Sequence, residues 1–313
     1  MRTDVVLVTG SNGFLGQNLR NAKVSDKFNW LFADTKNANL LREDETMRLF
    51  QAVRPKVLLH MAAVCGGIGA NKDSPADFVR LNSLMTCNVF DAARSCGTDY
   101  IYALGSVCAY PKHCPVPFKE DDIWSGYPEE TNAPYATAKR LQLVMQTAYR
   151  EQYGIKGAHL VPVNMYGIQD HFDLHNSHVI PALIRKIVEA KNNQSPTVEI
   201  WGTGKATREF LYAGDCAEAL VKAIEMELDY PGPINLGTGK DISIRELAEL
   251  IRQLVGYDGE FVYRGDAIDG QPKRRLDVSR AKEALGFEAQ TDLETGLKKT
   301  IDWYLENYEQ HED

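Results

Sequence analysis

The 313-residue sequence has no apolar run near the length of about 20 residues that a helix needs to cross a bilayer. Its first residues, MRTDVVLVTGSNG, lack the basic and apolar leader of a secretory signal. It contains no internal repeat and no low-complexity tract. We therefore expect a cytoplasmic protein without a membrane partner.

Positive charge is also in short supply, because 35 Lys and Arg stand against 43 Asp and Glu and give a formal net charge of −8. Proteins that bind nucleic acid need basic surfaces for the phosphate backbone, so this balance argues against a nucleic-acid partner. A small anionic ligand is still compatible with the composition if a few Arg and Lys gather locally.

Cysteine pairs with the spacing of a metal site are missing as well. In a chain of this size, scattered cysteines fit reduced thiols in the cytosol better than disulfides. We expect no bound metal. The six cysteines are Cys65, Cys87, Cys96, Cys108, Cys114 and Cys216.

What the first half does contain is a regular alternation of short apolar runs and helical stretches. Strands separated by helices at this rhythm predict an α/β fold of the Rossmann type, with right-handed crossovers and a doubly wound parallel sheet. The predicted strands lie in DVVLVTG, NWLFAD, VLLHMAA, YIYALGS and AHLVPVN.

After about residue 166 the pattern loosens. HNSHVIPALIRKIVEAK predicts a helix, and VEIWGTGKATREFL predicts a hairpin. GDCAEALVKAIE and PINLGT predict a helix and a strand that rejoin the sheet. We therefore expect a dinucleotide-binding domain over 1–165, rejoined by about 211–239, and a smaller α/β substrate-binding lobe over 166–210 and 240–313.

The segment VVLVTGSNGFLG joins a predicted strand to a predicted helix, and Gly10, Gly13 and Gly16 give it a GxxGxxG spacing. Glycines at these positions allow a tight turn and a close approach of the backbone to a pyrophosphate. The alternative is a tight turn without a ligand. Asp34 ends the next predicted strand, where an acid can bind ribose hydroxyls and disfavour a 2′-phosphate, although Lys36 could offset this.

Tyr135 and Lys139 lie four residues apart in a predicted helix that has Pro134 in its first turn. An ammonium group nearby favours the phenolate, so we expect Lys139 to lower the pKa of Tyr135. Such a phenol can exchange a proton with a carbonyl oxygen during hydride transfer. The alternative is a Tyr and a Lys that merely decorate a helix surface.

Ser106 ends the strand that precedes this helix, and Cys108 follows two residues later. On an extended strand end both side chains would face one cavity. His178 stands at the start of another predicted helix, where the helix dipole disfavours the imidazolium ion. A thiol and an imidazole could exchange protons on a sugar carbon. Alternatively, Cys108 could be a buried structural residue and His178 could cap its own helix.

Ser106, Tyr135 and Lys139 behind the glycine loop resemble the extended short-chain dehydrogenase/reductase superfamily. Nearly the whole chain resembles its GDP-L-fucose synthase family, which epimerises GDP-4-keto-6-deoxy-mannose at C3 and C5 and reduces it at C4. The stretches that carry the resemblance are GGIGANKDSPADF, GSVCAYPK, TNAPYATAK, PVNMYG, NSHVIPALIRK, WGTGKATREFL and DGQPKRRLDV.

The resemblance implies roles for individual residues. Cys108 and His178 would form the epimerisation acid/base pair, and Ser106, Tyr135 and Lys139 would carry the reduction. It also implies NAD(P)H as the cofactor, a GDP-sugar as the substrate and a homodimer as the assembly. The implied substrate-binding residues are Lys186, Trp201, Arg208, Asp269 and Lys273. The implied cofactor-binding residues are Gly10, Ser11, Asn12, Gly13, Phe14, Leu15, Gly16, Asp34, Asn39, Leu40, Ala62, Ala63, Asn82, Tyr135, Lys139, Pro162, Asn164, Met165 and His178.

Three positions depart from the family pattern. Asn12 stands where NADPH-using members often have a basic residue, which together with Asp34 favours NADH over NADPH. Gly214 replaces a usual Asp, and Lys186 replaces an Arg that would bind phosphate in a bidentate manner. A GDP-heptose is therefore an alternative substrate, with a C4 reductase or dehydrogenase that does not epimerise as the alternative activity. A dinucleotide sensor without catalysis is a further alternative, since a fold does not determine function.

Overall fold

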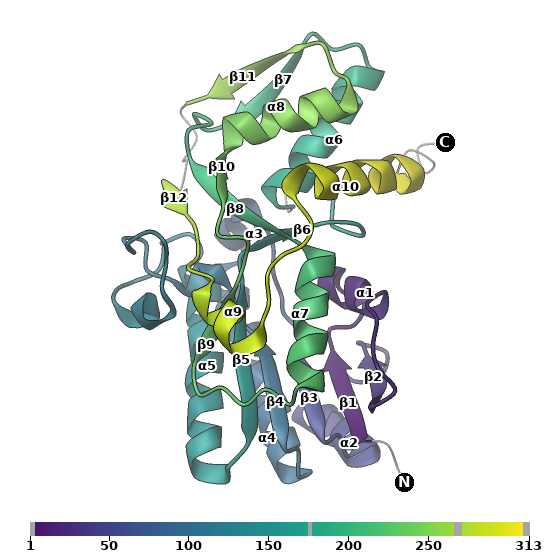
Figure 1. The fold of residues 1–313 in the computed structure, drawn as a ribbon, viewed down its shortest axis with the longest axis vertical. Helices are drawn as coiled ribbons and strands as arrows, with labels where there is room; N and C mark the ends of the chain where they lie inside the picture. The colour runs from purple at the N-terminus through teal and green to yellow at the C-terminus, as the bar shows by residue number, and fades with distance from the viewer. Residues whose placement is uncertain (1–3, 175–176, 266–270, 309–313) are drawn as a thin grey trace.

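The structure is a computed structural model and describes residues 4–174, 177–265 and 271–308 (Figure 1). Its centre is a six-stranded sheet in which every neighbouring pair is parallel, in the order β2-β1-β3-β4-β5-β9. The predicted doubly wound Rossmann-type sheet is therefore confirmed. The strands are β1 (Asp4–Thr9), β2 (Phe28–Ala33), β3 (Val57–His60), β4 (Tyr100–Leu104), β5 (Lys156–Pro162) and β9 (Pro233–Leu236).

Both faces of this sheet are buried, because alternate residues of each strand enter two different cores. Val6 and Val8 of β1 pack with α1 (Phe14–Arg20), α7 (Ala213–Glu225) and α9 (Ser279–Leu285). Leu7 of β1 packs on the opposite face, which α2 (Glu43–Val53), α4 (Pro75–Ser95) and α5 (Ala133–Tyr153) cover. Two fully buried faces explain why these strands read as continuous apolar runs.

The long helices begin and end at residues that suit a helix terminus. Pro75 starts α4, and Gly97 follows its end in a left-handed conformation with φ 76°. Pro134 lies in the first turn of α5, and Gly154, with φ 71°, ends it. The predicted helices around Tyr135 and ahead of Gly97 are thus confirmed. None of the described helices is long and apolar enough to cross a membrane.

A second core lies above the carboxyl ends of the central strands (Figure 1). It contains a sheet in which β8 (Thr207–Tyr212) pairs with β6 (Asn164–Tyr166), β10 (Asp241–Ser243) and β12 (Lys273–Arg274). The helices that pack there are α6 (Val179–Asn192), α8 (Ile244–Val255) and α10 (Leu293–Tyr308).

The predicted hairpin in VEIWGTGKATREFL is wrong. β7 (Thr197–Trp201) pairs in parallel with β11 (Glu260–Arg264), whereas β8 belongs to the other sheet. The segment between β7 and β8 contains Gly202 and Gly204, both with left-handed φ values, and it directs β8 away from β7. Alternating polar and apolar residues favour a strand but do not identify its partner.

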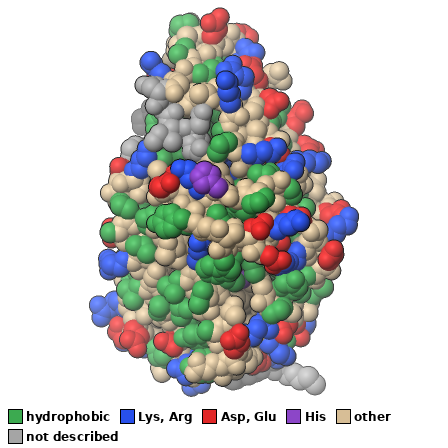
Figure 2. Space-filling view, turned by 90° about the vertical axis from the view of Figure 1, so that its left-hand side faces the viewer, with side chains coloured by type: hydrophobic (Ala, Val, Ile, Leu, Met, Phe, Trp, Pro, Cys, Tyr) green, Lys and Arg blue, Asp and Glu red, His purple; other side chains and the backbone are tan. Residues whose placement is uncertain are grey.

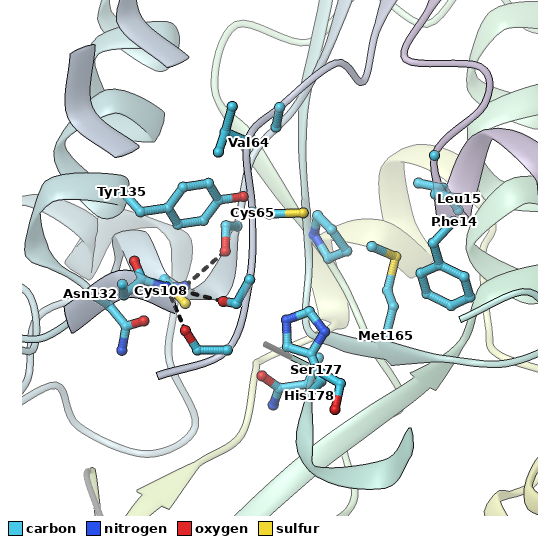
Figure 3. A pocket seen from close by; sticks show the side chains of 18 of the residues that line it. Phe14, Leu15, Val64, Cys65, Cys108, Asn132, Tyr135, Met165, Ser177 and His178 are labelled. Atoms are coloured by element: carbon cyan, nitrogen blue, oxygen red, sulfur yellow. Dashed lines mark hydrogen bonds between the residues drawn. The ribbon is translucent and has the colours of Figure 1, made fainter. Parts of the chain in front are cut away.

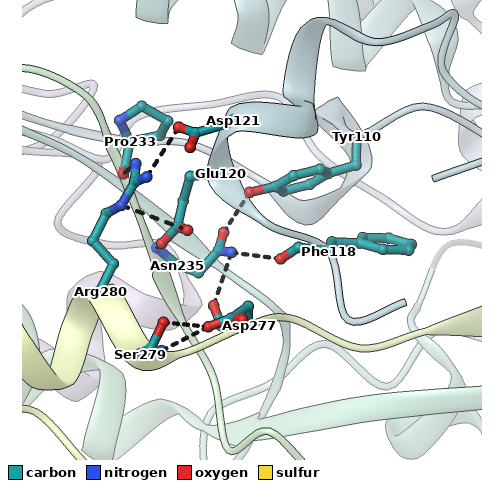
Figure 4. A network of polar contacts seen from close by, with 9 residues as sticks. All are labelled: Tyr110, Phe118, Glu120, Asp121, Pro233, Asn235, Asp277, Ser279 and Arg280. Atoms are coloured by element: carbon teal, nitrogen blue, oxygen red, sulfur yellow. Dashed lines mark hydrogen bonds and ion pairs between the residues drawn. The ribbon is translucent and has the colours of Figure 1, made fainter. Parts of the chain in front are cut away.

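One buried polar network fastens the loop after β4 to the rest of the molecule (Figure 4). The Tyr110 hydroxyl donates to Asn235 Oδ1 at 2.7 Å, and the Asn235 amide donates to the carbonyl oxygens of Phe118 and Asp277. Glu120, in the short 3₁₀ helix Glu120–Trp124, accepts from the Asn235 backbone N–H at 3.0 Å. Because Asn235 belongs to β9, the network fixes this loop to the central sheet.

Candidate active site

A cavity of about 1060 Å³ lies between the carboxyl ends of the central strands and the smaller core. Ligands of doubly wound sheets bind at this edge. Figure 3 shows residues of both parts around the same space: Tyr135, Cys108 and Asn132 on one side, Phe14, Leu15 and Met165 on the other, and Ser177 and His178 between them.

The glycine loop forms one wall of this cavity and can be built only with glycine. Gly10 has φ 76°, and a Cβ atom there would lie 2.6 Å from the Ala62 backbone nitrogen. A Cβ atom on Gly16 would lie 2.5 Å from the Gly10 carbonyl oxygen. Gly13 begins α1 without any side chain that caps its N–H groups. The loop therefore presents bare backbone to the cavity, as a dinucleotide site requires.

Asp34 lines the same cavity just beyond the end of β2. The Asn12 amide donates to Asp34 Oδ2 at 2.5 Å, and the Lys36 backbone N–H donates to Asp34 Oδ1 at 2.7 Å. These two bonds hold the carboxylate at the position where a nucleotide ribose lies in Rossmann-type folds.

Most of the predicted cofactor-binding residues line the cavity, but two do not. Ser11 is buried, and Arg20 donates to its hydroxyl at 3.0 Å. Asn82 is buried as well and bonds both the N–H and the carbonyl oxygen of Val64 at 2.9 Å. Both side chains therefore lie behind the wall of the cavity and stabilise it, and they do not face the cavity. The lining members are Gly10, Asn12, Gly13, Phe14, Leu15, Gly16, Asp34, Asn39, Leu40, Ala62, Ala63, Tyr135, Lys139, Pro162, Asn164, Met165 and His178.

Ser106 and Cys108 both line the cavity, but the predicted extended geometry is wrong. Ser106 begins a short 3₁₀ helix over Val107–Ala109, and its hydroxyl accepts from the Cys108 backbone N–H at 3.2 Å. The local hydrogen bond to a serine side chain competes with the strand and ends it. The turn still leaves both side chains on the cavity side, with the buried Val107 between them.

Lys139 is buried beneath this wall, with 4% of its surface exposed. Its ammonium group donates to the Leu104 carbonyl oxygen at 2.7 Å and lies 5.8 Å from the centre of the Tyr135 ring. Burial lowers the pKa of Lys139 to about 8.

The pKa of Tyr135 lies well above its usual value, which is the opposite of the predicted lowering by Lys139. Removal from water is the main cause, Cys65 and Cys108 add to it, and a hydrogen bond with Ser106 opposes it. The spacing of Tyr and Lys on a helix does not reveal how strongly the surroundings disfavour a phenolate. Tyr135 therefore holds its proton at neutral pH.

His178 is the N-cap residue of α6 and points into the cavity from the smaller core (Figure 3). Its pKa is lowered, as predicted, but the causes are removal from water and then the nearby His171. Cys108 reaches the cavity from the loop after β4, so the thiol and the imidazole come from different parts of the molecule.

Comparisons with known proteins give this arrangement a family. Residues 6–237 match the NAD dependent epimerase/dehydratase family. The chain belongs to this family. It is 39% identical to the probable GDP-L-fucose synthase 1 of Oryza sativa subsp. japonica, over 96% of this chain and 92% of that protein. The resemblance to GDP-L-fucose synthases is thereby confirmed.

Two solved structures of similar proteins share the fold. One is a GDP-L-fucose synthetase from Naegleria fowleri bound to NADP, with a TM-score of 0.87 and 26% identity, covering 99% of this chain and 96% of that one. The other is a GDP-6-OMe-4-keto-L-xylo-heptose reductase from C. jejuni, with a TM-score of 0.88 and 25% identity, covering 98% and 99%.

In this member of the epimerase/dehydratase family, the smaller core supplies cations and an aromatic ring to the cavity. Lys186 lies 5.0 Å from the centre of the Trp201 ring, and Arg208 lines the cavity beside them. Lys273 does not line it and pairs with Asp241 at 3.2 Å. Asp269, the remaining predicted substrate residue, lies outside the described residues.

Several residues that line the cavity have no role of their own predicted from the sequence, although the run Lys273–Arg275 indicates positive charge for a diphosphate. One of them is Arg274, which is 8% exposed and has its Nη1 atom 3.8 Å from the Cys108 sulfur. Alternation along β12 could have indicated that Lys273 and Arg274 point to opposite sides. No comparable signal in the sequence indicated the other lining residues. They are Cys65 and Lys72, from the segment after β3, and Glu129 and Asn132, just before α5.

Proposed function

We propose that this chain epimerises a GDP-4-keto-6-deoxy-mannose-type sugar at C3 and C5 and reduces it at C4, yielding GDP-L-fucose or a close relative. The observation that carries the proposal is that Cys108 and His178 reach the same cavity as Ser106, Tyr135 and Lys139. Reduction alone needs only the latter three. The names of the similar proteins support the substrate class.

The epimerisation uses the acidity of carbon next to a ketone, since the electron pair left at C3 or C5 is delocalised onto the C4 oxygen. Cys108 and His178 approach from the loop after β4 and from α6, so one can remove a proton and the other can return one from a different direction. The lowered pKa of His178 makes its imidazolium a stronger acid when it forms.

The reduction needs a proton for the C4 oxygen. The glycine loop would hold the pyrophosphate of a nicotinamide dinucleotide, which would supply the hydride for C4. Tyr135 holds its proton at neutral pH and can donate it to this oxygen, and Ser106 orients the same oxygen through its hydroxyl. Lys139, with a pKa of about 8, places positive charge behind the phenol and favours the phenolate that remains.

The family depends on a nicotinamide dinucleotide, and we propose that this chain prefers NADH. The Asp34 carboxylate lines the cavity beside Asn12, an uncharged residue, so a 2′-phosphate would meet a negative charge without a basic partner on the loop. Lys36 follows on an exposed turn. The family resemblance alone points to NADPH, and the Naegleria fowleri structure contains NADP.

We also propose a homodimer built from α4 and α5. These helices pack against each other and leave Leu84, Val144 and Tyr153 exposed by 36%, 50% and 45%. Hydrophobic side chains gather in the lower half of the face in Figure 2, on the side where α5 lies in Figure 1. We propose the cytoplasm as the compartment. We also propose a dinucleotide-binding domain over 1–165 and about 211–239, and a substrate-binding lobe over 166–210 and 240–313.

The second candidate is a C4 reductase of a related GDP-sugar, such as a GDP-heptose, that does not epimerise. It is favoured by Lys186 in place of the arginine of the family and by the similar heptose reductase structure. Such an enzyme would have no need to exchange ring protons with solvent.

The test is to incubate the protein with GDP-4-keto-6-deoxy-mannose in D₂O, with NADH and NADPH in separate reactions, and to analyse the product by NMR. GDP-L-fucose with deuterium at C3 and C5 supports the proposal. Reduction without ring deuterium supports the second candidate. No turnover with either cofactor contradicts the proposed substrate, and GDP-heptoses are then tested.

A further inference from the structure

Arg274 is a buried cation that faces the sulfur of Cys108. It lies in β12 with 8% of its surface exposed, and its Nη1 atom is 3.8 Å from Cys108 Sγ. Among the described residues, no carboxylate forms an ion pair with it. Its neighbours differ, because Lys273 and Arg275 both pair with Asp241. The charge of Arg274 is therefore not neutralised by an acid within the described part of the chain.

The guanidinium group is held by an anchor that also grips the Cys108 loop. Arg274 Nε donates to Gln271 Oε1 at 3.2 Å, and Gln271 is itself 5% exposed. The Gln271 amide donates to the carbonyl oxygens of Pro111 at 3.2 Å and Lys112 at 2.8 Å, three and four residues after Cys108. The same side chain thus ties Arg274 and the thiol loop together, which fixes the distance between charge and sulfur.

Other ionisable groups line the same cavity as Cys108. They are Tyr135 on α5, Cys65 after β3, His178 at the start of α6 and Glu129 ahead of α5. Tyr135 and the thiol Cys65 are neutral in their ordinary forms, and Glu129 is already bonded to Thr131 and Asn132. Further cations in the lining of the cavity are Lys72, Lys139, Lys186 and Arg208. Arg274 is permanently charged and contacts the sulfur itself, with Nη1 3.8 Å from Sγ.

We infer that Arg274 is a positioning residue: its guanidinium group holds the Cys108 sulfur in place and stabilises the anionic sulfur as it takes a proton from the sugar ring. In that step a C–H bond breaks, an S–H bond forms, and the electron pair moves through the ring carbon onto the C4 oxygen. A charged donor 3.8 Å from the sulfur makes a charge-assisted contact with the anionic sulfur that starts the step. The inference rests on the proposed epimerisation.

The test measures the thiol directly and needs no substrate. Iodoacetamide reacts with thiolates, and peptide mass spectrometry reports Cys108 and Cys65 separately in the same sample. At pH 7.5 we expect Arg274→Gln to slow the alkylation of Cys108 about tenfold. Arg274→Lys keeps the charge and should restore most of the rate. Arg245→Gln, an arginine of α8 that does not line the cavity, should leave the rate unchanged.

An unchanged Cys108 rate in Arg274→Gln would overturn the inference. So would an equal slowing of Cys65, which would mean that the arginine only shapes the cavity. If Arg274→Gln does not fold, Gln271→Ala releases the anchor and carries the same expectation. Ring deuteration by the wild-type protein tests the proposed function independently, so a failure of that function and a failure of this inference are distinguished.

Discussion

Single residues decide the cofactor preference that we propose. Replacing Asp34 by Asn removes the negative charge that a 2′-phosphate would meet, so the ratio of kcat/KM for NADPH to that for NADH should rise about tenfold, equivalent to about 1.4 kcal/mol. Steady-state kinetics with both cofactors measures the ratio. Asp44→Asn, an acid of α2 that does not line the cavity, is the matched control. An unchanged ratio in Asp34→Asn would show that the carboxylate does not face the ribose.

Two buried histidines beside Lys139 make the protein sensitive to acid. His60 and His159 are 1% and 2% exposed, and burial, with the charge of Lys139 as the second cause, lowers the pKa of each to about 3. In the unfolded chain a histidine titrates near pH 6.5. The unfolded state therefore binds more protons below pH 6.5, and the free energy of unfolding falls as the pH drops from about 6.5 towards 3.

Substitution of His159 by Gln should remove one of these contributions. As the pH falls below 6, the free energy of unfolding of the wild type should therefore decrease by about 1 kcal/mol per pH unit more than that of the variant. Urea denaturation at several pH values measures this difference. The control is His113→Gln, at an exposed position, whose free energy of unfolding should depend on pH in the same way as that of the wild type. The same pH dependence in His159→Gln and the wild type would contradict the account.

At the residue scale, motifs with fixed spacing could be predicted and contacts between distant segments could not. Tyr135 and Lys139 share a helix face, and the glycine loop is read from the twelve adjacent residues VVLVTGSNGFLG. Arg274 and Cys108 are 166 residues apart and are brought together by the pairing of β12 with β8 and by the bonds that Gln271 makes to the loop after Cys108. The pKa of Tyr135 also depends on burial by several elements, so its direction was missed.

Among the elements, α4 and α5 carry the proposed dimer interface. Val144→Glu places a charge in the exposed apolar face of α5 and should convert the dimer into a monomer, because burying an unpaired charge is costly. Light scattering after size-exclusion chromatography measures the mass. Val262→Glu, at a 41% exposed position on β11, is the control and should leave the assembly unchanged. A wild-type monomer, or a dimer that survives Val144→Glu, would contradict this interface.

Elements whose pattern is local were predicted well, and the errors concern pairing. The strands of the central sheet are apolar on both faces, and α4 and α5 have proline and glycine at their termini. The hairpin was wrong because β7 finds its partner in β11, about 60 residues later in the chain. The strand end at Ser106 was wrong because one serine hydroxyl bonds the backbone two residues ahead.

At the scale of the whole molecule, Glu209 links the two cores. It lies on β8, is fully buried, and its carboxylate accepts from the backbone N–H groups of Thr238 at 2.6 Å, Gly239 at 2.7 Å and Leu276 at 2.6 Å. Thr238 follows β9 of the central sheet, and Leu276 follows β12 of the smaller core. One side chain thus holds the junction above the cavity.

Glu209→Ala leaves these donors without an acceptor and should lower the free energy of unfolding by about 3 kcal/mol, since each buried unsatisfied group costs about 1–3 kcal/mol. Urea denaturation followed by circular dichroism measures the change. Glu218→Ala, at an exposed position on α7, should change it by less than about 0.5 kcal/mol. Equal effects of the two substitutions would contradict the role given to Glu209. No local pattern in the sequence indicated this buried acid, because its partners come from two distant loops.

The central claim is that one cavity holds two separable sets of residues, Cys108 and His178 for the ring protons and Tyr135 for the carbonyl oxygen. The most direct test is solvent exchange without any cofactor: GDP-4-keto-6-deoxy-mannose in D₂O with the Cys108→Ser and Tyr135→Phe variants, followed by NMR. We predict that Tyr135→Phe still introduces deuterium at C3 and C5 at close to the wild-type rate, whereas Cys108→Ser slows this exchange at least a hundredfold, in the range that a positioned acid or base contributes. Equal exchange by Cys108→Ser and the wild type, or loss of exchange in Tyr135→Phe, would contradict the account.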